Sequence, residues 1–89
     1  MRVIRASLVG DARRPAPKGP VSVVHDLLWA HAVPTDGLEH IRVKSADHGM
    51  DVFLFMRAPS DSDALRQVCA LLDRAHHPLR CQGYRVRDP

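Results

Sequence analysis

The sequence predicts a single α+β domain built from two helices and four strands. It has 89 residues, of which 45% are hydrophobic and 26% are charged, and this composition is ordinary for one folded domain. Short runs with alternating apolar residues, typical of strands, surround two longer stretches with apolar residues at three- and four-residue spacing, typical of helices. Clusters of proline, glycine and aspartate separate these runs. We therefore expect one domain over residues 1–89.

The N-terminal part is predicted to form a strand, a loop and a helix. Residues 2–9 carry Ile4, Ala6 and Leu8 at alternate positions, which favours a strand. Residues 10–19 hold two prolines, two glycines and three basic residues, so we expect a flexible loop rich in proline and arginine.

The first helix is expected over residues 20–33. Pro20 suits a first helical turn, and the Pro-Thr-Asp-Gly sequence at 34–37 would end the helix. Its apolar stripe consists of Val24, Leu27, Leu28 and His31. Trp29 lies outside this stripe, so we expect it to be exposed and covered either by the preceding loop or by a partner.

A hairpin is predicted next. Residues 38–44 alternate Ile41 and Val43 with polar residues, and residues 50–57 form an apolar strand. Residues 45–49 would join the two strands.

The C-terminal part is predicted to form a helix and a last strand. Ser60 followed by Asp63 resembles a capping box, which marks a helix start. Pro78 would end this helix, and residues 79–87 would form a strand with Gly83 as a bulge. The apolar stripe of the helix is Leu65, Val68, Cys69, Leu72 and His76.

The element order is βαββαβ, which is the order of the ferredoxin-like sandwich. Right-handed crossovers would then give a four-stranded antiparallel sheet of order 4-1-3-2, with both helices on one face. By alternation, the strand side chains facing the helices would be Ile4, Ala6, Leu8, Ile41, Val43, Val52, Leu54, Met56, Tyr84 and Val86. Nothing else in the chain is expected to cover the opposite face of the sheet.

That opposite face would combine aromatic and basic side chains. Alternation assigns to it Val3, Arg5, Ser7, His40, Arg42, Lys44, Phe53, Phe55, Arg85 and Arg87. Burying one phenylalanine side chain is worth roughly 1.5–3 kcal/mol, so we expect Phe53 and Phe55 to be covered by a partner.

We therefore hypothesise a small non-catalytic interaction module that binds through this face, most simply as a homodimer or with another protein. The proposed contact residues are Phe53, Phe55, Arg5, His40, Arg42, Lys44, Arg85 and Trp29. One alternative is single-stranded RNA, with bases stacked on the two phenylalanines, although Asp51 precedes them and the first strand has no aromatic residue. A second alternative is a small apolar molecule or a transition metal.

Six histidines and two cysteines raise the question of a metal site. Only His76, His77 and Cys81 are close together in the sequence, and they are weak candidates because adjacent helical residues point about 100° apart. We expect no bound cofactor. Cys69 and Cys81 are expected to be free thiols, since a helix packs roughly 10 Å from a sheet and a disulfide allows about 6.8 Å between Cα atoms.

No nucleophile elbow, phosphate-binding loop or zinc-binding helix motif is present, so an enzyme is not the favoured reading. The formal net charge is +3, but eleven of the thirteen basic residues are arginine, a bias typical of GC-rich bacterial genomes. No apolar run reaches the roughly 18 residues of a membrane span, and the N-terminus does not look like a signal peptide. We therefore expect a cytoplasmic bacterial protein that does not contact membranes.

Overall fold

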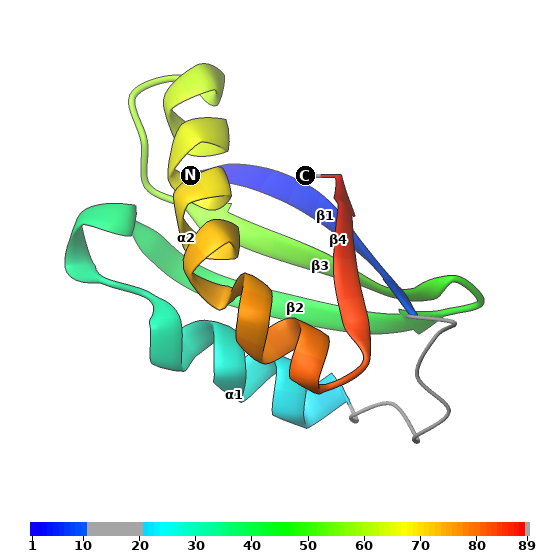
Figure 1. The fold of residues 1–89 in the computed structure, drawn as a ribbon. Coiled ribbons are helices and arrows are strands. Elements are labelled where there is room, and N and C mark those ends of the chain that lie inside the picture. The colour runs from blue at the N-terminus through cyan, green and yellow to red at the C-terminus, as the bar shows by residue number, and fades with distance from the viewer. Residues whose placement is uncertain (11–20, 89) are drawn as a thin grey trace.

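A computed structural model describes residues 1–10 and 21–88, and it confirms an α+β arrangement of two helices and an antiparallel sheet (Figure 1). The elements are β1 (Arg2–Gly10), α1 (Val21–His31), the short 3-10 helix η1 (Pro34–Asp36), β2 (Leu38–Ala46), β3 (Gly49–Met56), α2 (Asp61–Cys81) and β4 (Tyr84–Asp88). Except for Gly10, which ends β1, the predicted loop over residues 10–19 lies outside the described residues. Neither α1 nor α2 has the length and hydrophobicity that a membrane crossing would require.

The strands are arranged in the order β2-β3-β1-β4, which reads β4-β1-β3-β2 from the other edge. β3 and β1 are the two central strands, and every neighbouring pair is antiparallel. Both helices lie on the same side of this sheet (Figure 1). No helix of the described residues covers the other side, which is the open face predicted from the sequence.

The core lies between the sheet and the two helices. The predicted alternation is confirmed, because the strand side chains assigned to the helices are buried or packed against the core. Its fully buried strand members include Ala6, Leu8, Val52, Leu54 and Met56, and its helical members include Val24, Leu28, Val68, Leu71 and Leu79. Alternation therefore separates a buried face from an open face along β3, whereas residues 6–9 of β1 are buried on both sides.

The buried stripe of α2 differs from the prediction. Leu65 and His76 are exposed, and the buried stripe is Ala64, Val68, Leu71, Leu72, Ala75 and Leu79. Two of these residues are alanines, whose small side chains allow the helix backbone to approach the sheet. The sequence prediction was wrong here because it gave weight to the large apolar residues only.

The end of α2 is a second correction. The helix continues past Pro78 to Cys81, and β4 begins at Tyr84 rather than at residue 79. A proline inside a helix costs about 3 kcal/mol, but the added turn buries Leu79 completely, and that burial offsets much of the cost. Gly83 is not a bulge: with a φ of 89°, it lies in the turn between α2 and β4.

Polar contacts fix the ends of the helices. The amide of Asp63 donates to Ser60 Oγ at 3.1 Å, which confirms the predicted cap of α2. Asp36 in η1 is only 4% exposed, and its carboxylate accepts a hydrogen bond from the Val33 amide at 2.8 Å and pairs with Arg74 of α2. Because Arg74 also donates to the carbonyl of His31 at 3.1 Å, it connects α2 to the end of α1.

Tyr84 provides a test of this packing. Burial raises the pKa of its phenol above the ordinary value of about 10, because the charged phenolate would lose its solvation. The contribution of Tyr84 to the stability of the fold is therefore complete below about pH 10. It is lost as the pH rises through the pKa of the folded state. Tyr84 is the only tyrosine, so absorbance at 295 nm should show a native midpoint above that measured in urea. Equal midpoints would contradict its burial.

Candidate functional site

In the sheet register, the side chains of the open face form rows that run across the strands. The first row is largely apolar and centres on Phe55 of β3. In the sheet register, Phe55 lies between His40 of β2 and Val3 of β1. The rings of His40 and Phe55 are 5.3 Å apart, centroid to centroid, and are tilted by 54°. Val3 is 51% exposed, and Phe55 is half-buried. This row therefore offers an apolar surface with one imidazole at its edge.

The next row places a phenylalanine between two arginines. Phe53 of β3 is flanked by Arg42 of β2 and Arg5 of β1, and it is half-buried like Phe55. Arg42, Lys44 and the two phenylalanines line a shallow hollow of about 220 Å³. The structure thus brings together most of the residues that the sequence predicted for this site.

The third row contains a polar network that was not predicted from the sequence. Ser7 was predicted to be exposed, but it is buried, and its hydroxyl donates to Asp51 at 3.3 Å. The Nε2 atom of His48 lies 3.0 Å from the same carboxylate oxygen. Alternation places Ser7 and Asp51 on the same side and could have indicated the pair, but the position of His48 depends on the turn between β2 and β3.

Three basic residues outside the open face have acidic partners. Arg2, Arg66 and Arg74 form ion pairs with aspartates. The four basic residues of the open face are all exposed and form no ion pair with any residue that the structure describes; they are Arg5, Arg42, Lys44 and Arg85. Alternation does not fix the side of Arg87, because the register between β1 and β4 shifts there. The open face is therefore strongly cationic.

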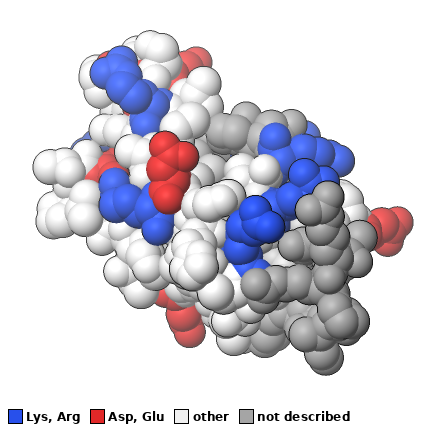
Figure 2. All heavy atoms as spheres, viewed as in Figure 1, with Lys and Arg blue, Asp and Glu red and all other residues white. Residues whose placement is uncertain are grey.

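The helical side shows a more mixed charge pattern. Figure 2, viewed with α2 in front of the sheet, shows some basic side chains beside acidic ones and others in a separate group at the right. The ion pairs of Arg66 and Arg74 belong to α2 on this side. Arg66 and Arg74 of α2 thus have acidic partners, whereas the four basic residues of the open face have none among the described residues.

Trp29 is separate from this site. It is 38% exposed, as predicted, but it belongs to α1 on the helical side of the sheet. It lines a different hollow of about 360 Å³, together with Ala32, Val33, Pro34, Gly37, Leu38 and Arg57. Trp29 is therefore not part of the open face, and its predicted role as a partner contact would concern the helical side.

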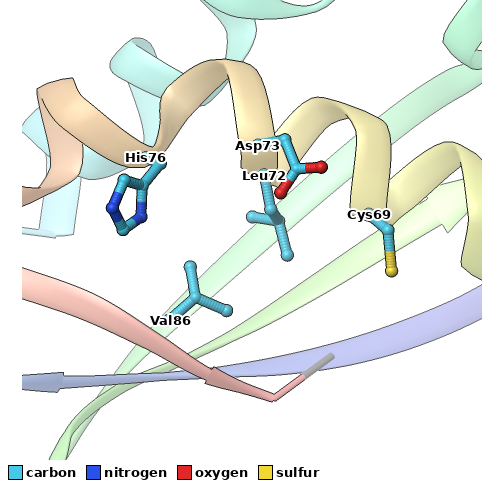
Figure 3. Close-up of a pocket in the computed structure, with 5 residues that line it drawn as sticks. All are labelled: Cys69, Leu72, Asp73, His76 and Val86. Atoms are coloured by element: carbon cyan, nitrogen blue, oxygen red, sulfur yellow. The ribbon is translucent and has the colours of Figure 1, made fainter.

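The three weak metal candidates do not form one site. Cys81 ends α2, not in the following strand as predicted, and its Sγ lies 3.7 Å from His77 Nε2, one helical turn back. His76 instead lines a hollow of about 120 Å³ between α2 and β4, with Cys69, Leu72, Asp73 and Val86 (Figure 3). In the described ranges, no three metal-binding side chains lie together. Both cysteines are free thiols, as predicted.

The open face combines two kinds of group that can contact another molecule. Its two aromatic rings offer flat apolar contacts, and its guanidinium and ammonium groups offer charge-assisted hydrogen bonds to anions. The hollow between α2 and β4 is smaller than the roughly 300–1,000 Å³ typical of small-molecule sites. No protein-family model, curated protein or solved structure matches this chain.

Proposed function

We propose that the protein is a non-catalytic interaction module that binds its partner through the open face of the sheet. The observation that carries this proposal is the position of Phe53 and Phe55, which lie half-buried on central strand β3, on the side away from both helices. Because both rings are already partly buried, covering their remaining exposed surface would contribute roughly 1–2 kcal/mol of hydrophobic free energy. We further propose that the fold is ferredoxin-like, and the βαββαβ order with both helices on one side of the sheet supports this.

Two kinds of partner fit different parts of this surface. A second copy fits the apolar row of Val3, His40 and Phe55, because a twofold interface pairs a surface with itself. Such an interface would also bring four uncompensated basic side chains of each copy close to those of the other. An anionic partner would instead be attracted by the same charges. The charge of the face therefore favours an anionic partner over a second copy.

Salt distinguishes these two partners. If the protein self-associates through the open face, salt should strengthen the dimer, since ions screen the repulsion between like charges. If the partner is anionic, salt should weaken the complex. Light scattering of the purified protein at 50 and 500 mM NaCl measures the first effect directly.

Two matched variants localise any dimer. Phe53→Asp places a charge at the centre of the open face, and Leu65→Asp makes the same change at an exposed apolar residue of α2. A dimer on the open face should dissociate with Phe53→Asp and persist with Leu65→Asp. A dimer that responds only to Leu65→Asp would contradict the proposed face, and a wild type that is monomeric at both salt concentrations would reject the second copy as partner.

A further inference from the structure

We propose that the anionic partner of the open face is single-stranded RNA, an inference that rests on the interaction module proposed above. Two bases would stack on Phe53 and Phe55, and the phosphates would be contacted by the surrounding basic side chains. These side chains are Arg5, Arg42, Lys44 and Arg85. Aromatic residues on a four-stranded sheet, bordered by basic residues, provide both contacts that single strands need.

The spacing of the two rings favours an unstacked strand. Phe53 and Phe55 are two residues apart on β3, so their side chains leave the same face about 6.7 Å apart. Stacked bases in a helix are separated by only about 3.4 Å. Two consecutive bases can therefore rest on the two rings only when they are unstacked from each other, as they can be in a single strand. A duplex keeps its bases stacked inside and cannot use this surface.

Charge complementarity supports an anionic polymer. Asp51 is an acidic side chain on the same face, but Ser7 and His48 already contact its carboxylate. Lys44 lies opposite Asp51 in the sheet register, yet the two form no ion pair. Both Lys44 and Arg42 line the hollow beside the two rings, where phosphates next to stacked bases would lie.

The side chains of the open face favour RNA over an acidic polypeptide or a second copy of the chain. An acidic polypeptide would satisfy the charges but lacks a flat base at every unit of the chain, and a second copy carries the same positive charge. His40 is exposed, and its ring lies 5.3 Å from that of Phe55, so its nitrogens can hydrogen-bond to the 2′-hydroxyl of a nucleotide stacked there. This contact is available to RNA and not to DNA.

Fluorescence anisotropy with a labelled eight-nucleotide uridine RNA tests the proposal. Four phosphate contacts predict that affinity falls about 50-fold between 50 and 200 mM salt, from a slope of about −0.7 per contact. Three competitors test which class of anionic polymer binds best. They are single-stranded DNA of matching length, duplex RNA and polyglutamate. We expect RNA to bind more tightly than all three.

Substitutions distinguish the contribution of base stacking to the affinity from that of the phosphate contacts. Phe53→Ala and Phe55→Ala should each lower the affinity about tenfold and leave the salt slope unchanged, because one base–aromatic stack is worth about 1–3 kcal/mol. Arg42→Gln and Lys44→Gln should each make the slope of log affinity against log salt concentration less steep by about 0.7. Leu65→Ala and Arg66→Gln on α2 are the controls and should bind RNA like the wild type. Circular dichroism confirms that each variant is folded.

Each other outcome overturns a defined part of the proposal. RNA binding that is unaffected by Phe53→Ala and Phe55→Ala rejects stacking, and equal affinity for DNA rejects the specificity for RNA. Tighter binding of polyglutamate would identify an acidic polypeptide instead. Failure to bind nucleic acid, together with a dimer that Phe53→Asp disrupts, would reject RNA but retain the interaction module. Failure to bind any probe together with a monomeric wild type would reject both.

Discussion

Replacing Asp36 by alanine is expected to lower the free energy of unfolding by about 2–3 kcal/mol. The Asp36 carboxylate is 4% exposed and has two partners, the Val33 amide and the Arg74 guanidinium. Its loss leaves Arg74 without a counter-ion close to the core. The Arg74 side chain is about one-third exposed and can recover part of its hydration, so the cost falls below the 3–5 kcal/mol typical of a fully buried pair. Urea denaturation measures the change.

Asp73→Ala is the matched control for Asp36→Ala. Asp73 is an exposed aspartate of α2 for which no hydrogen bond or ion pair is found in the described part of the chain, so its replacement should change stability by less than about 0.5 kcal/mol. Combining Asp36→Ala with Arg74→Ala should cost less than the sum of the two single changes, because they share one interaction. Equal effects of Asp36→Ala and Asp73→Ala would show that the pair contributes nothing.

Gly49→Ala is expected to destabilise the protein by about 2 kcal/mol or more. Gly49 has a φ of 148°, a conformation that residues with a Cβ rarely adopt, and it follows the turn between β2 and β3. An added Cβ would also collide with the backbone carbonyl of Leu8 on neighbouring β1. The backbone cannot yield there without separating the two central strands of the sheet.

Amide hydrogen exchange would locate the damage from Gly49→Ala. The Gly10 amide donates to the His48 carbonyl at 3.0 Å beside this contact, and it should exchange much faster in the variant. Ser45→Ala, at an exposed position of the same hairpin, should leave both stability and exchange near the wild-type values. An unchanged rate at Gly10 in Gly49→Ala would show that the strands accommodate the methyl group.

The sequence was sufficient for features that depend on local alternation. The period of two along each strand is a property of the backbone, so it placed Phe53, Phe55 and Arg42 on the open face without knowledge of the tertiary structure. The cap of α2 at Ser60 was equally local. Most of the candidate site could therefore be predicted from residue order.

Features that depend on contacts between distant residues could not be predicted in this way. Pro78 is a helix terminator by local rules, and only the burial of Leu79 against the sheet explains why α2 continues. The Asp36–Arg74 pair joins residues far apart in the chain, so no spacing rule indicates it. The absence of ion-pair partners for the open-face cations, within the ranges described, likewise depends on where every acidic residue lies in space.

The place of β1 in the sheet has a consequence for protein synthesis. β1 is synthesised before the other strands of the sheet, yet both of its neighbours are encoded later, and Leu8 pairs with Val86, 78 residues further along the chain. One edge of β1 can pair with β3 once Met56 has been made, but its other edge must stay unpaired until β4 has been translated. Contacts of such long sequence separation slow folding, so a newly made chain will depend on delayed closure of the sheet, and on protection from aggregation until then.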